Sequence, residues 1–324
     1  MRLYIDKDNL LSFLKSKDDK NFPFCRMMVI NQLDLMFNFT KEAAKADEAI
    51  WAFVQELADG AKDRVISYND VLFPTRPLKS NCSNVFDKLQ RSAIYLLNDE
   101  NIEVLEQRGE YLVAGLGKEV ETLSRLFFDD YQYDDRDLVK NINKWECIKK
   151  YVLPLTDVIL IDKYLFSDDT LYESNAYTLL KILVGNEQDK KVNIVIVTQK
   201  SNKDYTPDWE KIQKDIKTML KKKRGCINVT FVFLLADKET DEHDRTILTN
   251  YRRFYSGDSF NYVKSDGAII SKGREWEVSS LARKKSHNLA LILLDDIQTK
   301  ITLIKSRNPE HIFGDKICNY LNFS

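Results

Sequence analysis

The sequence predicts an α/β protein in which a mainly helical N-terminal region precedes a mixed, largely parallel sheet with helices on both faces. Apolar residues recur at three- and four-residue spacing through most of the first half. Between residues 158 and 235, by contrast, apolar runs of strand length alternate with helical segments. Because the pattern changes near Pro154, we expect a helical region over residues 1–153 and an α/β domain over residues 154–324.

The N-terminal region is expected to consist of helices with one possible strand among them. Asp8 or Asn9 suits the N-cap of the first helix, and several alanines between residues 43 and 49 favour the third. Pro74 and Pro77 interrupt the helical pattern. The predicted helices cover residues 9–15, 25–39, 41–57, 83–97 and 117–128, and the possible strand covers residues 110–114.

The second region alternates strands and helices. We expect buried strands over residues 158–162, 193–198 and 228–235, separated by helices over residues 169–184 and 207–223. Right-handed crossovers between such strands produce a parallel sheet that is covered on both faces. A further strand is expected after residue 243, and the apolar segment 288–305 is expected to pack onto the core.

Composition places the chain among globular proteins and excludes several classes of site. Lys and Arg number 49 against 50 Asp and Glu, so any contact with a phosphate must come from a local arrangement of charge. No two of the five cysteines are closely spaced in the sequence, so we expect neither a disulfide framework nor a zinc site. There is no apolar run of the length that a membrane span needs, and no signal-peptide pattern. We expect a cytoplasmic protein that needs no metal or cofactor.

Candidate binding residues follow or precede the predicted strands. In open α/β sheets, binding groups gather beyond the carboxyl ends of the strands. Asp162 and Tyr164 end the first of these strands, and His243, Asp244 and Arg245 stand before a later one. The turn that comes next offers Ser256, Gly257, Ser259 and Asn261.

These residues resemble the signature of the phospholipase D-like superfamily. That signature is His-x-Lys, four residues, Asp, and then a Gly/Ser-rich turn with an Asn. His243, Arg245 and Asn250 occupy the three defining positions, and Gly257, Ser259 and Asn261 lie where the turn would be. The segment is most similar to the C-terminal phospholipase D-like domain of MIT-domain-containing proteins, through the matching residues His243-Asp244-Arg245, Asn250-Tyr251, Gly257 and Asn261-Tyr262. The likeness covers about a third of the chain and does not reach residues 1–150.

The resemblance implies a phospholipase D-like fold for the second region and a chemistry centred on phosphate. In active members, one histidine attacks phosphorus and a second protonates the leaving oxygen, while lysines neutralise the phosphoryl oxygens. Because this chain carries one motif, the resemblance implies a homodimer. Arg245 keeps the positive charge of the usual lysine, whereas Asn250 lacks the charge of the usual aspartate.

Three functions follow as expectations. The first is recognition, without turnover, of a phosphate-containing ligand, either a phospholipid head group or a nucleic-acid backbone. The second is an active phosphodiesterase or nuclease with His243 as nucleophile across a homodimer. The third is a protein-interaction scaffold, in which the helical N-terminal region binds a partner. A purely structural role also stays open, because His243 to Arg245 can form an ordinary charged strand edge and Asp162 can cap the next helix.

Other polar clusters are assigned structural roles. The basic run at residues 221–224 is expected to end a helix, where cations complement the carbonyl end of the dipole. The basic run at residues 283–285 is expected in a loop and is the better candidate for contact with a polyanion. His287 and His311 are expected to be surface or packing residues, and the acidic segment 129–135 a solvated loop without a metal.

Overall fold

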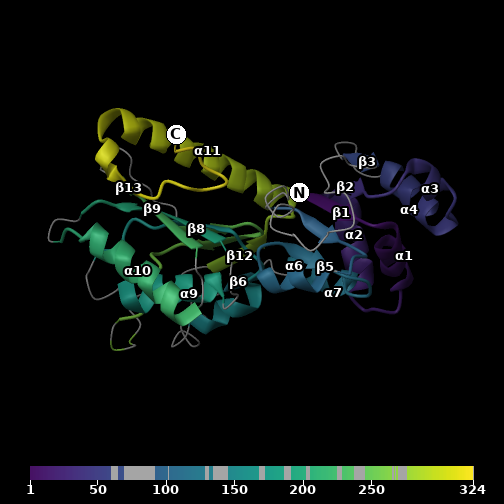
Figure 1. Ribbon diagram of the computed structural model, residues 1–324, viewed down its shortest axis with the longest axis horizontal. Helices are drawn as coiled ribbons and strands as arrows, with labels where there is room; N and C mark the ends of the chain where they lie inside the picture. Colours follow the sequence, from purple (N-terminus) through teal and green to yellow (C-terminus); the bar gives the residue numbers. More distant parts are fainter. Residues whose placement is uncertain are drawn as a thin grey trace. The chain divides into compact units, whose positions relative to one another are not determined.

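Two β-sheets organise the chain, one in each of two units (Figure 1). The first unit comprises Met1–Phe128 with Ser280–His287, and the second comprises Asp129–Ser279 with Asn288–Ser324. The boundary expected near Pro154 therefore lies within the second unit. The computed structural model describes residues 1–59, 65–68, 92–100, 102–127, 131–133, 145–167, 172–185, 191–201, 205–224, 228–236, 245–264, 266, 268 and 276–323.

The first unit contains a five-stranded sheet in the order β3-β2-β1-β4-β5. Every neighbouring pair in it is parallel. The chain moves outward from β1 to β3 and then returns to the other side of β1, which places a topological switch point between β1 and β4. The strands are β1 (Arg2–Ile5), β2 (Asp34–Phe37), β3 (Ile66–Tyr68), β4 (Ile94–Leu96) and β5 (Leu112–Ala114).

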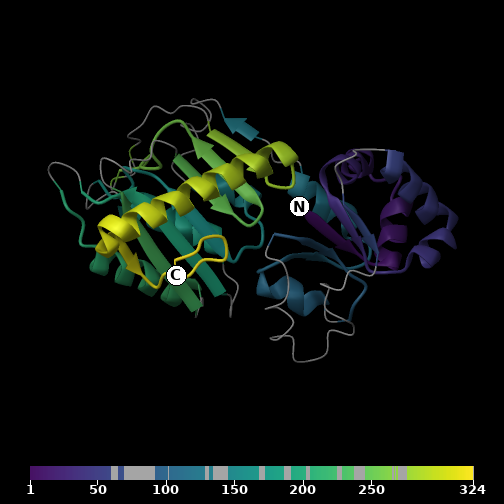
Figure 2. The same cartoon turned by 90° about the horizontal axis from the view of Figure 1, so that it is seen from above.

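Helices lie on both faces of this sheet (Figure 2). Ile102 and Leu105 of α6 pack against Tyr4, Tyr95 and Val113, which point to one face of the strands. On the other side α7 packs with α1 and α2. The helices of this unit are α1 (Lys7–Lys15), α2 (Phe22–Gln32), α3 (Lys41–Lys45), α4 (Glu48–Asp59), α6 (Ile102–Arg108) and α7 (Glu119–Phe127).

The first unit is α/β, so the expectation of a mainly helical region was incomplete. Its helices were largely foreseen, and the strand expected at residues 110–114 is β5. The other strands were missed because they are only three or four residues long, and β1, β2 and β4 are also largely buried on both faces and therefore show no alternation. The predicted helix over residues 25–39 includes β2, and the one over 83–97 includes β4, while residues 83–91 lie outside the described residues.

The second unit contains a mixed eight-stranded sheet in the order β13-β9-β8-β7-β10-β11-β12-β6. Its centre confirms the predicted trio of parallel strands, β7 (Asp157–Ile161), β8 (Lys191–Gln199) and β9 (Asn228–Ala236). Strand β10 (Arg245–Thr249) runs antiparallel to β7, and β11 (Arg252–Ser256) runs antiparallel to β10. The remaining strands are β6 (Tyr131–Tyr133), β12 (Trp276–Ser280) and β13 (Ile312–Gly314).

Figure 1 shows α11 (Lys284–Arg307) on one face of this sheet and α9 (Thr178–Val184) with α10 (Trp209–Arg224) on the other. A π-helical turn over Glu173–Tyr177 precedes α9. The buried residues of α11 recur at helical spacing, which explains how one stripe of a long polar helix covers the strands. These residues are Ala290, Leu293, Ile297, Ile301 and Ile304. None of the helices in the described part of the chain is both long and apolar enough to cross a membrane.

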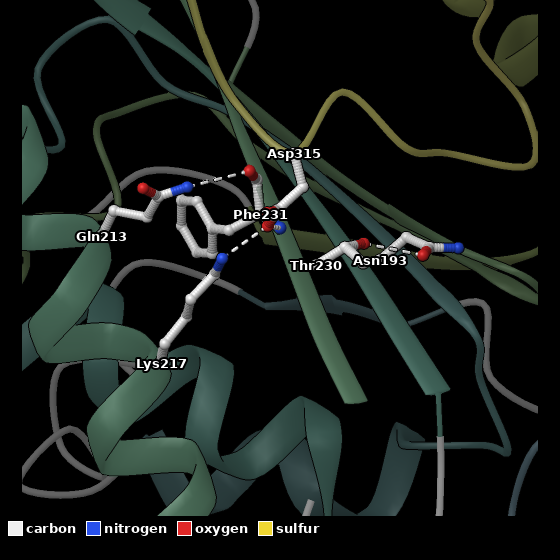
Figure 3. Close-up of polar contacts among 6 residues, drawn as sticks. All are labelled: Asn193, Gln213, Lys217, Thr230, Phe231 and Asp315. Atoms are coloured by element: carbon white, nitrogen blue, oxygen red, sulfur yellow. Dashed lines mark hydrogen bonds and ion pairs between the residues drawn. The ribbon is translucent and has the colours of Figure 1, made fainter. Parts of the chain in front are cut away.

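Asp315 holds the C-terminal strand β13 against β9 (Figure 3). Its carboxylate accepts hydrogen bonds from the backbone N–H of Phe231 at 2.7 Å and from the Lys217 ammonium at 2.5 Å. The backbone N–H of Asp315 donates to the Phe231 carbonyl at 2.8 Å, and Gln213 donates to the same carbonyl at 3.1 Å. Gly314 fits here because its φ is +112° and its α-carbon faces the Phe231 carbonyl.

We predict that Gly314→Ala destabilises the second unit by at least about 2 kcal/mol, through backbone strain combined with overpacking. The new Cβ would overlap the Phe231 carbonyl oxygen and lie 2.7 Å from the Gln213 amide nitrogen. Gly117→Ala is the control, because Gly117 also has a positive φ but no atom within 4 Å of an added Cβ. Urea unfolding followed by circular dichroism should show a loss of about 1 kcal/mol for the control. Equal losses would contradict the close-approach argument.

Candidate functional site

The candidate site lies at the edge of the second sheet where β7, β8 and β9 reach their carboxyl ends. Because β10 runs antiparallel to β7, with Thr246 opposite Ile161, its first residue Arg245 lies beside the end of β7. The turn that follows β11 returns to the same edge. The structure therefore brings together most of the predicted residues, namely Asp162, Tyr164, Arg245, Ser256, Gly257, Ser259 and Asn261.

Asp162 is the buried centre of this site, with none of its surface exposed. One carboxylate oxygen accepts a hydrogen bond from the backbone N–H of Tyr164 at 2.9 Å. The other accepts from the Ser259 hydroxyl at 2.8 Å and from the backbone N–H of Phe260 at 2.6 Å. Burial raises the pKa of Asp162 to about 6, although these hydrogen bonds and the nearby Arg245 charge act in the opposite direction.

Side chains of the turn after β11 hold it in place. The hydroxyls of Ser256 and Tyr262 are hydrogen-bonded to one another. Ser259 accepts a hydrogen bond from the backbone N–H of Asn261 at 3.2 Å, and the Asn261 amide donates to the backbone carbonyl of Tyr164. The serines and the asparagine thus join the turn to the end of β7 and position the donors that face Asp162.

Arg245 is half-buried beside Asp162 and Tyr164. The centre of its guanidinium lies 5.9 Å from the centroid of the Tyr164 ring, a cation–π distance. Its Nε is buried and has no hydrogen-bond partner among the described residues. A buried donor without an acceptor is unfavourable, so this nitrogen indicates a place where an acceptor could bind.

His243 and Asp244 lie outside the described residues, so the structure does not test the predicted nucleophile. Arg245, two positions after His243, lies at the edge of the sheet where β7 ends. The assignment of His243 as nucleophile stays a prediction.

Asn250 is not brought to the site, because it lies at the far end of β10. Its side chain is fully buried beside the start of β7. It accepts from the backbone N–H groups of Thr156 and Asp157 at 2.8 and 3.1 Å. It donates to the Thr156 hydroxyl at 2.9 Å and to the Tyr320 hydroxyl at 3.1 Å. Because an amide both donates and accepts, whereas a carboxylate only accepts, asparagine suits this network beside the buried Asp157.

Sequence reasoning missed Lys163 and Lys200 on the same edge, and it expected only a surface or packing role for His311, which is buried there. The Lys200 ammonium lies 2.7 Å from Nε2 of His311, which is buried just before β13. The Lys163 carbonyl accepts from the backbone N–H of Gln199 at 3.3 Å, so the ends of β7 and β8 are in contact. The available signal was position, since each lysine comes shortly after a predicted strand.

Some of the clusters that were assigned structural roles differ from expectation. Of the run at 283–285, Lys284 and Lys285 begin α11 instead of lying in a loop. Arg283 immediately precedes the helix, and its guanidinium donates to the Phe127 carbonyl at 3.0 Å. The run at 221–224 does end a helix, α10. Of the acidic segment, residues 131–133 form β6, and the rest lies outside the described residues. Within the described ranges no cluster of three or more His, Cys, Asp or Glu residues could hold a metal ion.

A second polar cluster lies at the switch point of the first sheet and was also missed. Asp6 follows β1 and is buried. Its carboxylate accepts hydrogen bonds from the backbone N–H of Asn98 at 2.7 Å and from the Asn38 amide at 2.9 Å. The Asn98 amide also donates to Asp8 at 2.8 Å. These bonds join the carboxyl ends of β1, β2 and β4, which is a sufficient structural reason for a buried acid there.

A comparison with models of known protein families and with curated proteins finds no match to this sequence. What the chain does must therefore be argued from its own residues and their geometry.

The raised pKa predicts how stability depends on pH. Since the pKa of Asp162 is about 6 in the folded protein against an ordinary 3.8, its contribution is fully present below pH 4 and is lost as pH rises through 6. The loss amounts to about 3 kcal/mol. Asp162→Asn removes this titration, so the stability of the wild type relative to the variant should fall by that order between pH 4 and pH 7.5. A difference that stays constant in urea unfolding at the two pH values would contradict a buried, titrating Asp162.

Proposed function

We propose that the second unit is a phosphate-recognition module, without turnover, whose ligand is bound at the carboxyl edge of β7. The observation that carries the proposal is the unpartnered, buried Nε of Arg245. A guanidinium with a free donor suits a phosphate oxygen in both charge and geometry. The resemblance to phospholipase D-like domains, in which the matching position contacts phosphate, supports the same choice.

The local charge supports an anionic ligand although the whole chain is nearly neutral. Arg245, Lys163 and Lys200 all lie at this edge. Two acids among the described residues lie in the site. Asp162 is fully buried and carries three hydrogen bonds of its own, and Asp258 in the turn after β11 is partly buried and accepts from the backbone N–H of the residue that follows it. The raised pKa of Asp162 means that this carboxyl is partly protonated near pH 6, which weakens its competition for Arg245.

The class of ligand and the assembly are part of the proposal. A phospholipid head group and a nucleic-acid backbone share the phosphodiester that Arg245 would contact. The single motif supports a homodimer, and a scaffold role for the first unit is the remaining alternative. Nothing in the described geometry favours turnover, because Asn250 acts at the opposite end of β10.

We predict that Arg245→Ala weakens binding of an anionic probe by roughly 10- to 100-fold, the loss expected for a charged hydrogen bond. Two probes are to be titrated, a fluorescent single-stranded oligonucleotide and vesicles that contain phosphatidylglycerol, an anionic phosphodiester. Lys191→Ala is the control, because Lys191 is an exposed cation at the opposite end of β8. Equal losses from both variants would indicate diffuse charge instead of a site.

We also predict that the wild type does not hydrolyse a generic phosphodiester, and that His243→Asn retains most of its affinity. An amide cannot replace a nucleophilic imidazole, whereas in a binding site the exchange removes about one hydrogen bond, about 1 kcal/mol. The measurements are product release from bis(p-nitrophenyl) phosphate and titration with the oligonucleotide and vesicle probes. Wild-type hydrolysis that disappears in His243→Asn would establish the enzymatic alternative.

A further inference from the structure

The carboxyl edge of the second sheet carries a row of cations on three neighbouring strands. Arg245 begins β10, Lys163 follows β7 and Lys200 follows β8, and the sheet order places these strands side by side. Adjacent strands are about 4.8 Å apart, so the backbone positions of the three residues span roughly 10 Å. The Lys200 ammonium extends the row towards His311, which precedes β13. A nucleic-acid strand carries one phosphate per nucleotide, at roughly 3.4 Å of axial rise in a duplex and farther apart in an extended single strand, so the row can contact more than one phosphate.

The cations do not lie free on the surface, because each is associated with a neighbouring ring. Lys200 is 2.7 Å from the buried His311. The Lys163 ammonium lies 5.4 Å from the centroid of the Tyr164 ring, and the Arg245 guanidinium lies 5.9 Å from the same centroid. Positioned charges lose less entropy on binding than mobile ones, so the row is prepared for a linear polyanion.

Tyr164 lies within this row and remains 39% exposed. An exposed aromatic ring among cations is the arrangement with which proteins bind single-stranded nucleic acid, since every base has a face that can stack. Two hydrogen bonds fix the backbone that carries the ring. The backbone N–H of Tyr164 donates to Asp162, and its carbonyl accepts from the Asn261 amide.

The same surface offers little to a bilayer. Binding to a membrane surface is strengthened by apolar side chains that enter the lipid as well as by cations. Among the described residues, the other exposed large apolar side chains lie in the first unit, on α11 or beyond β13. In the turn after β7, Tyr164 is the one exposed large apolar side chain among the described residues.

We propose that this row binds the backbone of single-stranded nucleic acid, with Tyr164 stacking on a base and Arg245, Lys163 and Lys200 contacting successive phosphates. This inference rests on the proposed phosphate-recognition function and selects its ligand class. It adds Lys163, Lys200 and Tyr164 to the residues that bind the ligand.

The test is a titration of the full chain with a fluorescent oligothymidylate of 12 nucleotides and, in parallel, with phosphatidylcholine vesicles that contain phosphatidylglycerol. We expect oligonucleotide binding in preference to vesicles. Tyr164→Ala should weaken it roughly tenfold and Tyr164→Phe should not. Lys200→Ala and Lys163→Ala should each lower the slope of log affinity against log salt by about 1, while Lys191→Ala leaves it unchanged.

The possible outcomes distinguish this inference from the proposed phosphate recognition on which it rests. Binding to vesicles but not to oligothymidylate, lost in Arg245→Ala, would overturn the nucleic-acid inference and leave phosphate recognition intact. The assigned surface would be overturned if oligonucleotide binding were no weaker in three variants than in the control Lys191→Ala. These variants are Tyr164→Ala, Lys163→Ala and Lys200→Ala. Binding of neither probe would overturn both proposals. Circular dichroism of each variant checks that the fold is retained.

Discussion

The buried carboxylate of Asp162 is the constraint on which the candidate site depends. It joins the end of β7 to the turn after β11 through Ser259 and Phe260, and to its own following turn through Tyr164. A fully buried acid is unfavourable unless donors surround it, so its neighbours must keep their places. Asp162 therefore fixes the backbone of Tyr164, and Arg245 lies near both the Asp162 charge and the Tyr164 ring.

A second buried acid, Asp157, organises the other end of the same strand. Its carboxylate accepts from the Thr156 hydroxyl at 2.7 Å, from the Asn193 amide at 2.9 Å, and from the backbone N–H and amide of Asn319 at 3.0 and 2.7 Å. Asn250 joins this network, which ties the C-terminal segment to the sheet. The two ends of β7 thus have different roles, a structural one at its start and a candidate binding one at its end.

How much of the fold could be predicted depended on the length of its strands. The trio β7, β8 and β9 was predicted because runs of five to nine residues between helical segments have few alternative interpretations. Strands such as β2 and β4, with four and three residues, merge into neighbouring helical periodicity. Their pairing in a parallel sheet depends on contacts between residues far apart in the chain, and no local pattern reports those contacts.

The sequence by itself determined the α/β class of the second unit and pointed to Asp162, Tyr164, Arg245 and the turn at 256–261, because residues at strand ends can be located from the strands. Only the tertiary structure decided which of the candidates meet. It separated Asn250 from the others and added Lys163, Lys200 and His311. The physical reason is strand direction: an antiparallel β10 brings its first residue, and not its last, to the end of β7.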